Sequence, residues 1–65
     1  MTGQLHKPFI TVSSGMSGYF AVLMTWSEEG FYEPWNTGIG RYREKSGAAR
    51  EAMQWALDEE LEYRA

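Results

Sequence analysis

The segment YFAVLMTW, residues 19 to 26, is apolar at nearly every position instead of alternating apolar and polar side chains. An unbroken run of this length is typical of a central β-strand whose two faces are both covered. A strand of this kind needs neighbouring strands on its edges and apolar groups above and below it. The segment therefore predicts a sheet, and the remaining residues must supply its cover.

The segments on either side of this run predict two further strands. FITVS, residues 9 to 13, is rich in β-branched residues, and SSGMSG, residues 13 to 18, has the composition of a turn. SEEG, residues 27 to 30, predicts a hairpin loop in which Gly30 takes positive φ, so the chain returns as a third strand from Phe31 to Arg43. Pro34 and the glycines of GIG, residues 38 to 40, predict an irregular edge strand with a bulge at the glycines.

A helix is predicted after the third strand, with Ser46 as its cap and GAAREAMQWALDEELEY, residues 47 to 63, as its body. An apolar stripe recurs in it at three- and four-residue steps, and the small alanines in it favour close packing on a sheet. The stripe consists of Ala49, Ala52, Met53, Ala56 and Leu57. Residues 1 to 8 are expected to form a loose N-terminal lead. The predicted fold class is α+β: one domain over residues 9 to 65, with a three-stranded antiparallel sheet and one C-terminal helix on one face.

A single helix can cover only one face of that sheet. Side chains alternate along a strand, so Ala21 and Leu23 point to one side and the larger apolar groups to the other. The smaller pair is expected to contact the helix. The opposite face is then predicted to bind another protein or a second copy in a homodimer, because aromatic and Met side chains are favoured at interface centres. The candidate protein-binding residues are Phe20, Met24, Trp26, Tyr32 and Trp35. For each ring, simple core packing is the alternative.

Composition limits the classes of function. With 65 residues, a small core is expected, and the absence of cysteine leaves no disulfide and no thiolate ligand or nucleophile. That composition suits a reducing cytoplasm. A net charge of −3 disfavours general attraction to nucleic acid or anionic lipid. No apolar run approaches the length of a membrane span, and the N-terminus does not resemble a signal peptide.

No residue set suggests catalysis, so the chain is expected to be non-enzymatic, without a metal, a cofactor or a small-molecule substrate. His6 is the only histidine and has no second ligand beside it. The serines fit turns and a cap. GIG lacks the third glycine and the following helix of a phosphate-binding loop.

Acidic residues crowd the end of the predicted helix, where the macrodipole favours cations. This cluster is either a functional surface or is neutralised by Arg41, Arg43 or Lys45, with Arg64 pairing with Glu60 at i,i+4. Its members are Asp58, Glu59, Glu60 and Glu62. A further acidic pair, Glu28 and Glu29, is expected to be solvated at a hairpin tip.

The alternative function is nucleic-acid binding. Its candidate residues are Arg41, Tyr42, Arg43 and Lys45, in which cations alternate with an aromatic ring. The passage GRYREKSGAAREAMQWAL resembles in order the strand, turn and Ala-rich helix of plant AP2-type DNA-binding domains and of the arm-binding domains of tyrosine recombinases. That resemblance implies a sheet that contacts DNA through Arg and Trp. Residues 19 to 26 depart from it, because they contain no basic residue.

The chain is also similar to small uncharacterised phage and prophage proteins in which a hairpin sheet ends in a helix of the EAxxWA type. The matching residues are Glu51, Ala52, Trp55 and Ala56. This resemblance implies a protein that binds a host protein and inhibits or redirects it.

Overall fold

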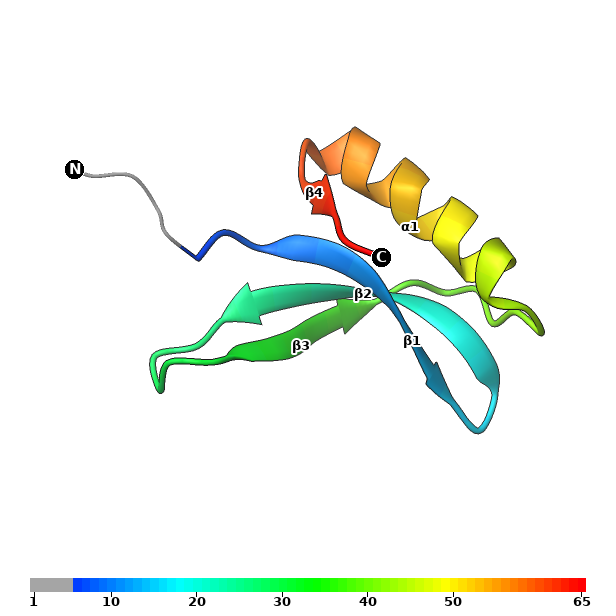
Figure 1. Cartoon of the computed structure of the whole chain (residues 1–65), viewed down its shortest axis with the longest axis horizontal. Helices are drawn as coiled ribbons and strands as arrows, with labels where there is room; N and C mark the ends of the chain where they lie inside the picture. The colour runs from blue at the N-terminus through cyan, green and yellow to red at the C-terminus, as the bar shows by residue number, and fades with distance from the viewer. Residues whose placement is uncertain (1–5) are drawn as a thin grey trace.

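The computed structural model describes residues 6 to 65 and contains one sheet and one helix (Figure 1). The strands lie in the order β3-β2-β1-β4, so β2 and β1 are internal and β3 and β4 form the edges. The elements in chain order are β1 (Phe9–Gly15), β2 (Gly18–Trp26), β3 (Tyr32–Thr37), α1 (Lys45–Glu59) and β4 (Glu62–Tyr63). The α+β class is confirmed.

The first hairpin is longer than the sequence pattern predicts. Its ladder continues to the pair Gly15 and Gly18, so the turn between the strands consists only of Met16 and Ser17. Gly18 has φ of 116°, a conformation that residues with a Cβ rarely adopt. A Cβ at this position would also lie 2.5 Å from the carbonyl oxygen of Tyr42. Glycine is required here because two backbone segments meet.

The second hairpin follows the prediction at its loop and departs from it in the returning strand. Gly30 has the expected positive φ, 97°, and β3 is an edge strand. However, β3 ends at Thr37 instead of continuing to Arg43. The register shift lies opposite Leu23 and Met24, which pair with Asn36 and Pro34, so Trp35 is the additional residue. Beyond β3, Thr37 pairs with Val22 and Tyr42 pairs with Tyr19, so residues 38 to 41 lie opposite only residues 20 and 21. The predicted irregularity at the 38–40 glycines is therefore present, and the one at Trp35 is a second that the sequence pattern does not predict.

The helix begins two residues before the predicted start and ends before the predicted end. Its N-cap is Glu44, which makes no side-chain capping bond, so the prediction that Ser46 caps the helix is wrong. At the other end, Glu60 takes the left-handed conformation with φ of 58°. The N–H of Leu61 then donates to the carbonyl of Ala56 at 2.8 Å. This arrangement satisfies a free carbonyl of the last turn and reverses the chain.

The reversal produces a fourth strand that the sequence pattern does not predict. β4 lies parallel to β1, with Glu62 beside Phe9 and Tyr63 beside Ile10. The N–H of Arg64 extends the pairing by donating to the carbonyl of Ile10 at 2.9 Å. The predicted three-stranded antiparallel sheet is therefore wrong, and the sheet is four-stranded and mixed. A two-residue strand carries no detectable periodicity, and only its neighbour defines it.

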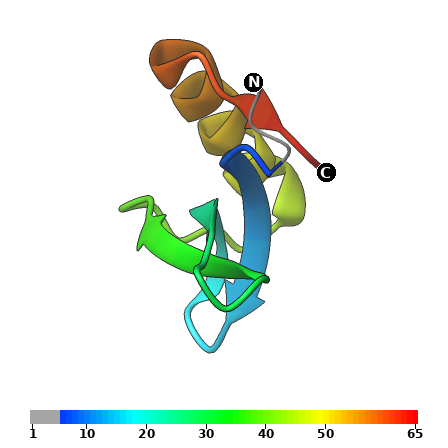
Figure 2. The ribbon, with the colours of Figure 1, turned by 90° about the vertical axis from the view of Figure 1, so that its left-hand side faces the viewer.

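The helix packs on one face of the sheet, as predicted, and it covers the face that carries Ala21 and Leu23 (Figures 1 and 2). Ile10, Ala21 and Ala52 are completely buried where the two layers meet, and Ala56 is 4% exposed. Alanines at this contact let the helix axis approach the strands closely. The predicted stripe is wrong for Met53 and Leu57, which are exposed, while Ala48 is buried in the contact instead. The partly buried residues around this core are Val12, Leu23, Trp55, Leu61 and Tyr63.

Candidate protein-interaction face

The face of the sheet opposite α1, here called the open face, combines side chains from three strands. Directly paired residues of antiparallel strands point to the same side, so the register identifies its members. Phe20 pairs with Ser13, and Met24 pairs with both Phe9 and Pro34. Neither view of the ribbon shows a helix on this side (Figures 1 and 2). The open face consists of Phe9, Thr11, Ser13, Phe20, Val22, Met24, Trp26, Tyr32, Pro34 and Thr37.

A groove of about 430 Å³ occupies the centre of the open face. Val22 is 3% exposed, while Phe20 and Met24 are half-buried. The predicted binding residues Phe20 and Met24 are thus brought together in a concave, mainly apolar site. The groove is lined by Thr11, Val12, Ser13, Phe20, Val22, Met24, Pro34 and Thr37.

An aromatic cluster lies at the end of the open face where β2 and β3 meet the loop between them. The rings of Trp26 and Tyr32 make an edge contact, with centroids 4.9 Å apart, and Phe9 meets Tyr32 in the same way at 4.8 Å. His6 stacks on Trp26 with centroids 3.7 Å apart and ring planes 10° apart. The Tyr32 hydroxyl donates to the carbonyl of Lys7 at 3.0 Å. Two more predicted residues, Trp26 and Tyr32, therefore lie together, beside residues of the N-terminal segment.

Trp35 stands apart from this cluster. The bulge in β3 gives it no partner on β2, and its side chain is 71% exposed. Within residues 6 to 65 its ring makes no aromatic contact. It nevertheless follows Pro34 directly, and Pro34 lines the groove. Trp35 is therefore a separate exposed ring at the sheet edge.

Two arginines complete the open face, and sequence reasoning did not assign either of them to it. The guanidinium of Arg41 lies over the ring of Phe20 at 4.6 Å, and that of Arg64 lies over the ring of Phe9 at 4.2 Å. Arg64 also pairs with Glu62 at 3.2 Å, and this hydrogen bond raises the pKa of Arg64 further. No local signal could place Arg64, because its position depends on the pairing of β4 with β1.

Of the four predicted nucleic-acid-binding residues, Tyr42 and Arg43 line one hollow, whereas Arg41 and Lys45 are not among its lining residues. The N–H groups of Tyr19 and Tyr42 each donate to the other's carbonyl, at 2.8 and 2.9 Å, so this loop segment continues the sheet. Arg41 contacts Phe20 on the open face. Tyr42 contacts Glu51 of the helix instead, while Arg43 and Lys45 are exposed.

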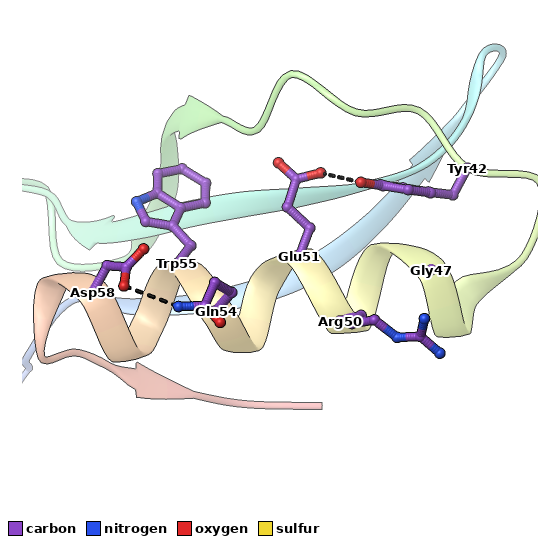
Figure 3. Close-up of a pocket in the computed structure, with 7 residues that line it drawn as sticks. All are labelled: Tyr42, Gly47, Arg50, Glu51, Gln54, Trp55 and Asp58. Carbon is purple, nitrogen blue, oxygen red and sulfur yellow. Dashed lines mark hydrogen bonds between the residues drawn. The ribbon is translucent and has the colours of Figure 1, made fainter.

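A second hollow, of about 580 Å³, lies beside α1 (Figure 3). The Tyr42 hydroxyl donates to Glu51 Oε1 at 2.8 Å, and this bond to a carboxylate raises the pKa of Tyr42, with smaller contributions from burial and from the Glu51 charge. A Cβ at Gly38 or Gly40 would overlap the same carboxylate. Glu51 therefore holds the loop after β3 against the helix. The lining residues are Tyr42, Gly47, Arg50, Glu51, Gln54, Trp55 and Asp58.

The acidic residues at the C-terminal end of α1 do not all belong to the helix. Asp58 and Glu59 are helical, Glu60 is the reversal residue, and Glu62 lies in β4. The expected pair between Arg64 and Glu60 is wrong, because Arg64 pairs with Glu62 across one residue of strand. Asp58 accepts a hydrogen bond from Gln54 at 3.0 Å.

Within residues 6 to 65, no three His, Cys, Asp or Glu side chains are grouped so that they could hold a metal ion. In the same range, no helix combines the length and apolarity that crossing a membrane requires. Comparisons with protein-family models, curated proteins and solved structures gave no match.

Proposed function

We propose that this chain is a small, non-enzymatic protein-interaction domain that binds another protein through its open face. One observation supports this proposal above the others. The single helix covers the Ala21 side of the sheet and leaves Phe20, Met24, Trp26 and Tyr32 on the other side around a mainly apolar groove. Contiguous apolar surface with aromatic and Met side chains is typical of protein interfaces.

The similarity to phage and prophage proteins supports a more specific form of the proposal, in which the bound protein belongs to a host and is inhibited or redirected. The cysteine-free composition supports a cytoplasmic location for this encounter. The alternative function, nucleic-acid binding through Arg41, Tyr42, Arg43 and Lys45, receives less support. Only Tyr42 and Arg43 share a hollow, while the Arg41 guanidinium lies over Phe20 on the open face.

The proposal can be tested with two methionines in matched positions. Met24 lies in the open-face groove, whereas Met53 lies on the outer side of α1 and is 51% exposed. Replacement by glutamine keeps the length of the side chain and makes its end polar. Affinity capture from host extract should recover one protein with the unmodified chain and with Met53→Gln, and lose it with Met24→Gln.

Circular dichroism of both variants is needed to confirm that each remains folded. If folded Met24→Gln retains the same partner and Met53→Gln loses it, the binding site lies on the helix and the proposal is wrong.

A further inference from the structure

We propose that the partner segment bound by the open face is acidic, with carboxylates on either side of an apolar anchor. In this arrangement the anchor occupies the groove, and Arg41 and Arg64 bind the carboxylates at its two ends. The inference rests on the function proposed above and specifies the chemistry of the partner.

The two guanidinium groups lie at opposite ends of the groove. Arg41 covers Phe20, and Arg64 covers Phe9, which pairs with Met24 four residues along β2 from Phe20. At about 3.3 Å per strand residue, the two rings are about 13 Å apart along the strand. An extended peptide has the same rise per residue, so acidic residues about four positions apart match the two cations.

Each guanidinium is already held in place and still has donors to offer. Arg41 uses Nη1 to donate to the carbonyls of Gly38 and Gly40, at 2.8 and 3.0 Å, and Arg64 uses Nη2 to bind Glu62. Within residues 6 to 65, the remaining nitrogens of Arg41 donate to no other group of the chain. A guanidinium fixed over a ring loses little freedom when it binds a carboxylate in a bidentate manner.

The distribution of charge distinguishes an acidic partner from a second copy of the chain. The open face carries Arg41 and Arg64, and Glu62 beside Arg64 is the acidic residue that the strand register places on it. Two such faces pressed together would oppose cation to cation. Because Glu62 partly neutralises Arg64, Arg41 should contribute more to binding.

Nucleic acid fits the same face less well. Bases bind proteins by stacking on the faces of aromatic rings. Here His6 stacks on Trp26, Arg41 lies over Phe20 and Arg64 lies over Phe9, so each of these rings has a face occupied within the chain. Two arginines in a protein of net charge −3 also provide few phosphate contacts. The groove favours an apolar side chain over a base.

A displayed library of random peptides, selected on the immobilised full chain, tests the inference. Selected peptides should be enriched in Asp and Glu on both sides of an apolar residue. Arg41→Gln should weaken their binding about tenfold, and Arg64→Gln should weaken it less. Arg43→Gln is the matched control, because Arg43 is an exposed cation of the same loop and should leave binding unchanged. Arg41→Lys keeps the charge without the bidentate geometry, and it should give an intermediate loss.

The outcomes separate this inference from the function on which it rests. The selected peptides could lack acidic enrichment and bind to Arg41→Gln but not to Met24→Gln. That result would contradict the proposal of an acidic partner and still support the open face as the binding site. Peptides that bind both variants equally well, or a library that yields no binder, would count against both proposals. If no peptide is selected and a single-stranded oligonucleotide binds in a way that depends on Arg41, nucleic-acid binding would replace both proposals.

Discussion

The two faces of the sheet differ in how far their apolar side chains are buried. On the covered face, Ala21 and Ile10 of the sheet are fully buried against Ala48 and Ala52 of the helix, and larger side chains are partly buried around them. The open face carries aromatic and Met side chains, including Phe20 and Trp26, which stay partly exposed. Small side chains allow close packing, but each buries little apolar area. Burial of one CH₂ group stabilises the fold by about 0.8 kcal/mol, so each alanine contributes little.

This difference teaches how a chain with one helix divides its apolar surface. A sheet has two faces, and the helix packs on the face whose side chains allow the closest approach of helix and sheet. The rings of the open face remain uncovered by the helix, and contacts among Phe9, Trp26, Tyr32 and His6 bury only part of their surface. A partner would complete that burial. Substitutions on the two faces should therefore differ in their effects.

The largest effect is expected from Ile10→Ala. Ile10 is the largest fully buried side chain among the described residues, and its truncation leaves a cavity between helix and sheet. We expect a loss of about 2 to 5 kcal/mol in the free energy of unfolding, measured by urea denaturation. Met24→Ala on the open face should cost about 1 kcal/mol, because Met24 is already partly exposed. Equal losses would mean that both faces act as core, and the contrast between them would fail.

A smaller loss is expected from Gly18→Ala, with Gly30→Ala as its control. Both glycines have positive φ, which costs a residue with a Cβ about 1 to 2 kcal/mol. At Gly18 the new methyl group also meets the carbonyl of Tyr42, whereas at Gly30 nothing lies within 4 Å. Thermal unfolding should therefore show a larger decrease for Gly18→Ala. The backbone pairing of Tyr19 with Tyr42 lies beside Gly18 and sets the position of Arg41. Equal decreases in melting temperature for the two variants would show that this pairing does not constrain the residue at position 18.

The third prediction concerns binding to the partner once it has been captured. Trp35→Ala should weaken the complex by about 2 kcal/mol, because tryptophans next to a binding groove are frequent hot spots. Glu28→Ala, in the loop at the end of the hairpin, should change it by less than about 0.5 kcal/mol. Titration calorimetry measures both. Since Trp35 is 71% exposed, its removal should leave the melting temperature unchanged, and similar effects of the two variants would argue against the aromatic surface.

The smallest effect is expected at the covered side, from Tyr42→Phe, and it depends on pH. The hydrogen bond to Glu51 raises the Tyr42 pKa above 10.0 in the folded protein, so the neutral phenol is favoured by folding. The stabilisation is therefore complete below pH 10 and is lost as the pH rises through the raised pKa. Melting temperatures of the two proteins should differ at neutral pH and converge in more alkaline buffer.

The other tyrosines ionise in the same alkaline range, so only the difference between the unmodified protein and Tyr42→Phe is informative. Glu51→Gln removes the negative charge and should lower the pH at which stability declines. A difference that persists unchanged in alkaline buffer would show that the phenol to carboxylate bond contributes nothing.

Several elements could be predicted because their signals are local. The apolar run predicted β2, the turn composition with Gly30 predicted the second hairpin, and Pro34 predicted that β3 lies at an edge. The alternation of small and large side chains along β2 predicted which face the helix covers. Of the candidate site, Phe20, Met24 and Trp26 could be placed on one face for the same reason. Tyr32 joins them through its pairing with Trp26, which the alternation along β2 does not predict.

Other features had no local signal. The bulge at Trp35 depends on how β3 aligns with β2, since either neighbouring residue could have been the unpaired one. The helix cap was predicted at Ser46 from its side chain. The helix instead starts at Lys45, and its first turns contact the loop after β3 through Glu51, a contact between segments that no local pattern reveals. Arg64 joined the open face only because β4 adds to β1.

The sequence by itself determined that this protein has one helix for a sheet with two apolar faces, because side-chain period and composition are properties of each segment alone. Only the tertiary structure decided that the sheet has a fourth, parallel strand and that Arg41 and Arg64 lie at the two ends of the groove. The physical reason is that pairing between distant strands depends on backbone hydrogen bonds and on the space left by the alanine-faced helix. No single segment encodes either of them.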